Sequence, residues 1–165
     1  MTLGTEVHEP MFRSGVRLKG CQKKLVEQLI KQIHESPGPP TRKLIGRCLA
    51  TLFNVGDASL LFDSINKCND TVRNKDDSPS FLQVKLAAIS CLGTMYQHLG
   101  RMTGRSYEET VYILLKSLKN AESQTRCEVM IAMEKKLCLD LVMQQLLVHK
   151  DIFKALRHCL DRSCS

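Results

Sequence analysis

The sequence predicts an all-α protein, an α-solenoid of about seven helices arranged in antiparallel pairs. Between Gln22 and Arg126, apolar residues recur at helical spacing in one segment after another, and Gly, Pro, Asp and Asn separate the segments. Aromatic residues make up only 5% of the 165 residues and Trp is absent, so aliphatic side chains must fill the core, which suits packing of helix on helix. Helix pairs that each carry one apolar face can bury it only by stacking on their neighbours.

The first predicted helix covers Cys21 to about His34, where Leu25, Leu29 and Ile33 recur four residues apart. The preceding residues 1–20 contain several glycines and no sustained period. We therefore expect an irregular N-terminal extension over 1–20, followed by helical repeats over 21–131 and diverged helices over 132–165.

A Ser-Pro-Gly-Pro-Pro run at 36–40 ends the first helix, because Pro lacks an N–H donor and disfavours a helical residue before it. Thr41 is the expected cap of a second helix over Arg42–Asn54. In the next break, Gly56 suits a left-handed C-terminal position, and Asp57 is the expected cap of the third helix.

The third helix is expected to reach about Asn74. Ser78 as N-cap and Pro79 at the first position predict a fourth helix over Ser80–Leu99, the most strongly helical segment of the chain. One side of this helix is expected to carry its apolar residues, namely Val84, Ala87, Ala88, Cys91, Leu92 and Met95.

Gly100 and Gly104 frame the loop that follows. The segment Ser106–Glu109 has the pattern of a capping box, in which the Ser hydroxyl and the Glu carboxylate accept from each other's backbone N–H groups. The remaining helices are expected over 106–118, from about 121 into Leu137–Val148, and over Asp151–Leu160.

The net charge of +7 and the pI near 9.1 raise the question of a nucleic-acid partner. The basic residues recur singly or in pairs, such as Lys23-Lys24 and Arg42-Lys43, and alternate with acidic residues. Nucleic-acid modules usually combine a basic stripe with stacking aromatics or a base-reading helix, and neither is visible. We interpret the charges as solvated faces. The alternative hypothesis is a basic helical module that binds nucleic acid or an anionic membrane surface.

Motif analysis predicts no enzyme, and no catalytic, cofactor-binding or metal-binding residues. The five histidines lie far apart, and Gly100-x-x-x-Gly104 lacks the spacing of a phosphate-binding loop. No cysteine pair has zinc-site spacing, and no signal peptide or membrane-spanning run is visible, so we expect reduced thiols in a cytoplasmic protein. The cysteines are Cys21, Cys48, Cys68, Cys91, Cys127, Cys138, Cys159 and Cys164.

The segment Asn69–Asp77 is densely polar. We interpret it as a capped helix end followed by a solvated turn. The alternative hypothesis is a ridge that binds a partner.

Several ordered blocks of this sequence resemble the N-terminal region of the HEAT repeat-containing protein 5 family. The resemblance covers about residues 22–131 and resumes faintly at 149–154 and 161–163. Its most distinctive blocks are Ser36-Pro37-Gly38-Pro39-Pro40-Thr41-Arg42-Lys43-Leu44, Arg73-Asn74-Lys75-Asp76-Asp77-Ser78 and Leu114-Leu115-Lys116-Ser117-Leu118-Lys119-Asn120-Ala121-Glu122-Ser123-Gln124.

The resemblance implies a HEAT/armadillo-type fold and a protein-protein interaction role in vesicle-mediated transport. Members of the family are long cytoplasmic solenoids linked to clathrin-adaptor trafficking between endosomes and the Golgi, in a complex with aftiphilin and gamma-synergin. Any membrane association is then expected to be peripheral and to pass through such partners. Residues 1–20 and 132–148 depart from the family pattern, and the sequence stops at Ser165. We therefore expect a short isoform, a fragment or a diverged copy.

Overall fold

The computed structural model describes residues 10–76, 78–104, 106–118 and 122–133, and these residues form an all-α fold without a β-strand. This result confirms the prediction of an all-α fold. The helices are α1 (Pro10–Ile33), α2 (Pro39–Val55), η1 (Ala58–Leu60), α3 (Leu61–Arg73), α4 (Pro79–Leu99), η2 (Gly100–Thr103), α5 (Ser106–Ser117) and α6 (Ser123–Ala132).

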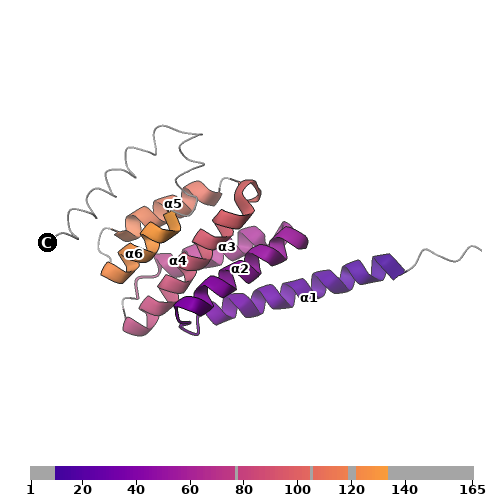
Figure 1. The fold of residues 1–165 in the computed structure, drawn as a ribbon, viewed down its shortest axis with the longest axis horizontal. Helices are drawn as coiled ribbons and strands as arrows, with labels where there is room; N and C mark the ends of the chain where they lie inside the picture. Colours follow the sequence, from indigo (N-terminus) through magenta and orange to yellow (C-terminus); the bar gives the residue numbers. More distant parts are fainter. Residues whose placement is uncertain (1–9, 77, 105, 119–121, 134–165) are drawn as a thin grey trace, which may run out of the picture.

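Each helix packs against the helix that lies two positions away in the order of the chain. Helix α4 packs between α2 and α6, and we call these three the even-numbered layer. Helix α3 contacts both α1 and α5, which together form the odd-numbered layer. The layers are joined where α1 packs on α2 and α3 packs on α4. Figure 1 shows these helices side by side, with α1 extending beyond the others at its N-terminal end.

Helix α4 is the centre of the hydrophobic core. Every residue from Leu86 to Tyr96 is buried, so this helix has no solvent-facing side along that stretch. The sequence predicted an apolar stripe on one side only, and that prediction was too narrow. Neighbours on several sides of α4, including α2, α3 and α6, exclude water from its whole circumference.

The contacts within the even-numbered layer are unusually close because glycines lie in them. A Cβ atom added at Gly46 of α2 would lie 2.8 Å from Thr94 Cβ of α4. A Cβ atom added at Gly93 would lie 2.9 Å from the Cα atom of Ala132 in α6. Small residues at these crossings allow the helix backbones to approach closely.

Two predicted signals for the start and the end of a helix are confirmed. Ser78 is the N-cap of α4, since its Oγ accepts from the Phe81 N–H at 3.3 Å, and Pro79 occupies the first helical position. Gly100 ends α4 with a φ of 42°, a backbone conformation that glycine adopts with little strain.

The predicted start of the first helix was wrong. Helix α1 begins at Pro10, so residues 10–20 are helical instead of irregular. Gly15 and Gly20 lie inside the helix, where each costs about 1 kcal/mol relative to Ala. That cost lowered the expectation of a helix, but it does not end one. Pro10 occupies the first position of the helix, where a backbone N–H would have no partner within the helix, so the missing N–H of proline costs nothing.

The predicted caps around α2 were also wrong. Helix α2 starts at Pro39 with Gly38 as N-cap, and Thr41 lies inside its first turn. The two prolines already have the φ that a first helical turn needs. Gly56 does follow α2, but with a φ of −112° and not in the left-handed region. Its lack of a side chain matters for a different reason, because an added Cβ would lie 2.5 Å from Gln22 Oε1.

The predicted capping box at the start of α5 is not formed. The Ser106 hydroxyl donates to the Thr103 carbonyl, and the Glu109 carboxylate pairs with Arg73 of α3. A tertiary ion pair has replaced the local hydrogen bond. Asp57, by comparison, does accept from a backbone N–H, that of Ser59 at 2.9 Å, although it caps the short η1 and not α3 itself.

Two further results concern the limits of the apolar pattern. Leu25 and Leu44 follow the predicted helical stripes, yet their exposed fractions are 51% and 60%.

In the part of the chain that the structure describes, none of the helices has the length and apolar character of a membrane span. The helices predicted over 137–148 and 151–160 lie outside the described residues.

Candidate functional site

A groove of about 780 Å³ lies between the α3–α4 turn and the C-terminal half of α5. Its walls also include the start of α6 at Glu122 and Thr125. The volume is within the range of about 300–1,000 Å³ that is usual for ligand sites. Among the described residues it is the best candidate for a recognition surface, because it combines an apolar floor with a charged rim.

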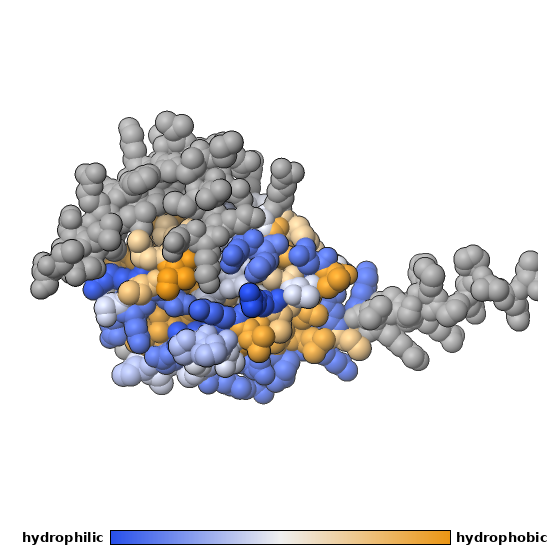
Figure 2. Space-filling view, in the orientation of Figure 1, coloured by the Kyte–Doolittle hydropathy of each residue, from blue (hydrophilic) through white to orange (hydrophobic). Residues whose placement is uncertain are grey.

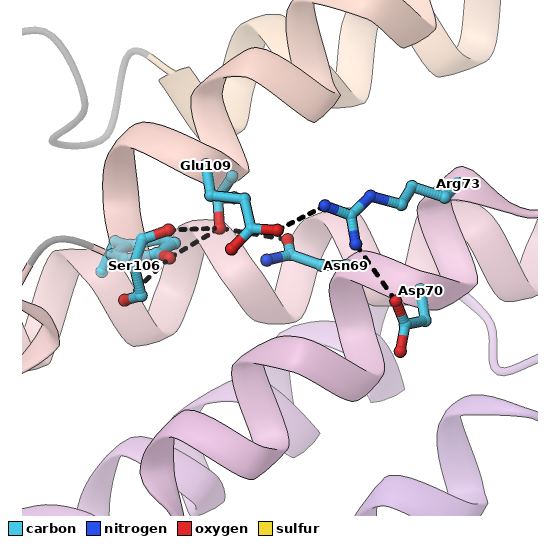
Figure 3. A network of polar contacts seen from close by, with 7 residues as sticks. Asn69, Asp70, Arg73, Ser106 and Glu109 are labelled. Carbon is cyan, nitrogen blue, oxygen red and sulfur yellow. Dashed lines mark hydrogen bonds and ion pairs between the residues drawn. The ribbon is translucent and has the colours of Figure 1, made fainter.

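The wall of the groove at α3 is fixed by a polar junction between α3 and α5 (Figure 3). Arg73, which lines the groove, donates to Asp70 at 3.2 Å and also pairs with Glu109 of α5. Hydrogen bonding to Glu109 is the main cause of a raised pKa for the Arg73 guanidinium. The positive charge of Arg73 is therefore compensated by two carboxylates, those of Asp70 and Glu109.

Deeper in the same junction, three buried polar side chains meet. Thr110 Oγ1 lies 3.0 Å from Asn69 Oδ1, 2.7 Å from Tyr96 Oη and 3.1 Å from the Ser106 carbonyl. Asn69 and Thr110 are almost completely buried, so these contacts are not exchanged for water. Burial also raises the pKa of Tyr96, which keeps the phenol protonated as a donor.

The hydrogen count at Thr110 indicates how the Asn69 amide is oriented. One threonine hydroxyl carries one hydrogen and cannot donate to both Asn69 and Ser106. With Oδ1 toward Thr110, the buried Asn69 Nδ2 has no partner among the described residues. A half-turn of the amide lets Nδ2 donate to Thr110, while Thr110 donates to the Ser106 carbonyl and accepts from Tyr96. We infer this second orientation, because it gives the Thr110 hydroxyl a single acceptor and gives Asn69 Nδ2 a partner.

The floor of the groove is apolar. It is formed by Val72 at the end of α3, Leu82 and Ile89 on α4, and Ile113 on α5. Leu82 and Ile89 are seven residues apart, so the floor extends about 10 Å along α4. Tyr112 stands beside the floor with 68% of its surface exposed. Its ring is a large amphipathic surface of the kind enriched at protein interfaces.

The rim of the groove carries more positive than negative charge. Arg73, Lys75, Lys85 and Lys116 line it, against Asp76 and Glu122. The Asp76 carboxylate accepts from the Ser78 N–H at 2.9 Å, and this bond is the main cause of its lowered pKa. Asp76 is thus an ionised part of the turn itself. Lys75 and Lys116 are exposed at the mouth of the groove.

The polar segment Asn69–Asp77 is divided between the two roles considered for it. Asn69 is buried in the junction, and the Asn74 and Asp76 side chains cap the turn by accepting from backbone N–H groups, as a capped helix end requires. Residues 72–76 also line the groove, as a partner-binding ridge would. The two interpretations are compatible because the turn supplies the shape of one groove wall. Asp77 lies outside the described residues.

Two further polar contacts join distant elements, and the sequence did not predict either. Arg42 was expected on a solvated face but is buried, where it donates to the Pro37 carbonyl at 2.8 Å and to Gln83 of α4. Gln22 of α1 donates to the carbonyls of Leu52 and Asp57 and accepts from the Asp57 N–H. A single Arg or Gln in a helical pattern does not reveal such a partner beforehand.

In the part of the chain that the structure describes, the thiols and imidazoles show no metal-binding arrangement. In the described ranges, no three His, Cys, Asp or Glu side chains lie close enough to hold a metal ion. Cys21 and Cys127 are exposed free thiols, whereas Cys68 and Cys91 are buried. Burial raises the pKa of the Cys68 thiol to about 12 and that of Cys91 well above its ordinary value. The buried pair therefore stays protonated and chemically inert at neutral pH.

No protein-family model matches this chain, and no solved structure matches it. The helix arrangement, the groove and the polar junction are therefore the features that indicate a function.

Proposed function

We propose that this chain is a non-enzymatic protein-protein interaction module, built as an α-solenoid of HEAT-type helix pairs. The observation that carries the proposal is the contact pattern in which each helix packs on the helix two positions away. In a stack of helix pairs, the first helices of successive pairs pack together, and so do the second helices. Alternate helices from α1 to α6 pack on each other in the described part of the chain, which supports this arrangement.

The shape and chemistry of the surface also support a binding role. Stacked pairs present their inter-helix turns along one edge, and such edges serve as extended binding surfaces. The groove lies between the α3–α4 turn and the region where α5 leads into α6, which is where two neighbouring pairs meet. On the face seen in Figure 2, hydrophobic and hydrophilic residues are interspersed in small areas.

The resemblance to the HEAT repeat-containing protein 5 family extends this proposal to a cellular role. In that role the chain acts as part of a clathrin-adaptor-associated scaffold in transport between endosomes and the Golgi. Its partners would be aftiphilin, gamma-synergin or the adaptor complex, and it would reach membranes only through them. The helical pairs over 21–131 are the region that carries this resemblance.

The test is an affinity pull-down from cytosol with the full 165-residue chain, followed by identification of the retained proteins. Leu92→Asp is the matched negative control, because an unfolded chain keeps the composition and loses the shaped surface. We expect a small set of stoichiometric partners that bind the wild type and not the control. Equal recovery of the same proteins by both chains would show that the captured proteins recognise exposed apolar sequence and not a folded module.

The alternative function is a basic module that binds nucleic acid or an anionic membrane surface, as the net charge of +7 suggests. Phosphate-backbone binding falls steeply with the logarithm of salt concentration. A binding curve for a DNA oligonucleotide measured across salt concentrations therefore separates the two functions. Tight binding with a steep salt slope, and no retained protein in the pull-down, would favour the alternative.

A further inference from the structure

We propose that the groove between α3, α4 and α5 binds a short acidic segment of a partner protein, with apolar side chains of that segment on the groove floor. This inference rests on the proposed function and names the partner chemistry for one site of the module. It follows from the charge of the rim, the apolar character of the floor and the exposed tyrosine between them.

Charge complementarity decides the sign of the partner. The rim has four basic residues and two acidic ones, and Asp76 is held in its own turn by hydrogen bonding. Arg73 is compensated by Asp70 and Glu109. The exposed Glu122 lies on the same rim, so the attraction for an incoming acidic chain is local to Lys75 and Lys116, which stand exposed at the mouth from two different elements. Carboxylates placed between these two lysines would be attracted from both walls.

The floor decides against a purely electrostatic ligand. Val72, Ile89 and Ile113 are buried beneath the groove, and the half-buried Leu82 and the exposed Tyr112 ring supply apolar surface below and beside the charged rim. A phosphate backbone gains nothing from such a floor, and a flat membrane surface does not enter a concave site. A peptide carries acidic and apolar side chains on one chain and so satisfies both parts of the groove.

Tyr112 supplies the expected anchor. It lies one helical turn before Lys116 on α5, so both side chains line the same wall. Its exposed ring provides large contact area at low conformational cost, and tyrosine is frequent among residues that dominate binding energy. The α3–α5 junction holds this wall in place, because Glu109 and Thr110 of α5 are bonded to Arg73 and Asn69 of α3.

The experiment measures fluorescence anisotropy with three labelled peptides of about 12 residues, which span about 18 Å as a helix and so exceed the groove. The first peptide carries Leu and Phe four positions apart among Asp and Glu residues. The second has Lys in place of every acid. The third keeps the acids and has Ala in place of Leu and Phe. A single-stranded DNA oligonucleotide provides the nucleic-acid comparison.

The protein variants are Lys75→Glu with Lys116→Glu, and the matched control Lys24→Glu with Lys43→Glu. Lys24 and Lys43 are exposed and do not line the groove. Because each double variant replaces two Lys by two Glu, the two have the same net charge. Tyr112→Ala tests the anchor separately. Circular dichroism verifies that each variant keeps its helix content, as expected for exposed positions.

We expect the first peptide alone to bind, and we expect the groove double variant to weaken it by about tenfold or more while the control pair changes it little. Tyr112→Ala should also weaken it. Equal weakening by both double variants would overturn the proposal, since long-range charge would then explain the binding. Binding of the second or third peptide as tightly as the first would overturn it as well, as would no binding of the first or oligonucleotide binding that depends on Lys75 and Lys116.

The pull-down separates this proposal from the broader one. If the wild type retains a partner and the groove double variant and Tyr112→Ala retain it equally, the chain is an interaction module that uses another surface. If the wild type retains no partner, the proposed function itself fails.

Discussion

The helices within each of the two layers are held together by different interactions. In the even-numbered layer, α2, α4 and α6 meet mainly through apolar and small side chains, with Gly46 against Thr94, Gly93 against Ala132, and one polar contact from Arg42 to Gln83. In the odd-numbered layer, α3 meets α5 through hydrogen bonds and an ion pair. Close apolar packing supplies most of the stability of a fold, whereas buried polar contacts require one specific alignment of their partners. The even-numbered layer should therefore determine how stable the protein is, and the odd-numbered layer how its surface is shaped.

The largest effect is expected for Leu92→Asp, at the centre of the even-numbered layer. Leu92 is completely buried, and an unpaired carboxylate there should cost about 4 kcal/mol or more. Because small proteins are stable by only about 5–15 kcal/mol, this loss removes much or all of the margin, so the variant should populate the unfolded state far more than the wild type. The control is Pro79→Ala, which changes only the first position of α4 and should cost less than about 1 kcal/mol. Equal urea midpoints for the two variants would contradict the central role of α4.

An alkaline titration should show the next largest effect, at the boundary between the layers. The pKa of Cys68 on α3 is raised from 9.0 to about 12, so the folded state keeps the proton where the unfolded state releases it. Stability should consequently fall as pH rises above 9, by up to about 1.4 kcal/mol per pH unit from this thiol. Urea unfolding of wild type and Cys68→Ala at several pH values isolates the contribution. Parallel pH profiles for the two proteins would show that Cys68 does not titrate differently on folding.

Gly93→Ala tests the close approach of α4 and α6. The added Cβ would lie 2.9 Å from the Ala132 backbone, so α6 must shift, and we expect a loss of about 1–3 kcal/mol. Gly20→Ala is the matched control, because nothing lies within 4 Å of its added Cβ in α1. That change should instead stabilise the protein by up to about 1 kcal/mol. Opposite signs in thermal unfolding would support the packing explanation, and a stabilised Gly93→Ala protein would refute it.

Thr110→Val tests the polar junction of the odd-numbered layer. The replacement has nearly the same shape but leaves Tyr96 and Asn69 without their shared partner, which should cost about 1–3 kcal/mol. Tyr96→Phe and the double variant complete a double-mutant cycle. A clear coupling energy is expected between the two positions. Strictly additive losses would mean that the hydroxyls do not act together.

The smallest effect is expected for Arg73→Ala at the surface of the same junction. Arg73 and Glu109 are each about half exposed, and ion pairs of this kind contribute less than about 1 kcal/mol. The free energy of unfolding should thus change little. The orientation of α5 should change more. The affinity of the groove for the acidic peptide that carries Leu and Phe measures this change. A large loss of stability with unchanged peptide binding would reverse the assignment of roles to the two layers.

The location of the helices followed from the sequence to a large degree, and the groove did not. Ser78 and Pro79 mark the start of α4 because an N-cap and a first-position proline act within a few residues of the chain. The Ser106 pattern failed for the opposite reason, since Glu109 found a partner 36 residues away in Arg73. The segment 69–77 was noticed as polar, but its division into a buried Asn69 and a groove wall depends on α5 packing beside it.

By itself, the sequence determined that this protein is helical, where most of its helices end, and that aliphatic residues fill its core. These properties depend on periodicity and capping, which are encoded over one or two helical turns. The tertiary structure alone decided that α4 is buried on every side, that Arg42 lies inside, and that Lys75 and Lys116 share one groove. Each of these facts involves residues about forty positions apart. Their proximity arises from how whole helices pack, because many side chains together determine that packing and no local pattern specifies it.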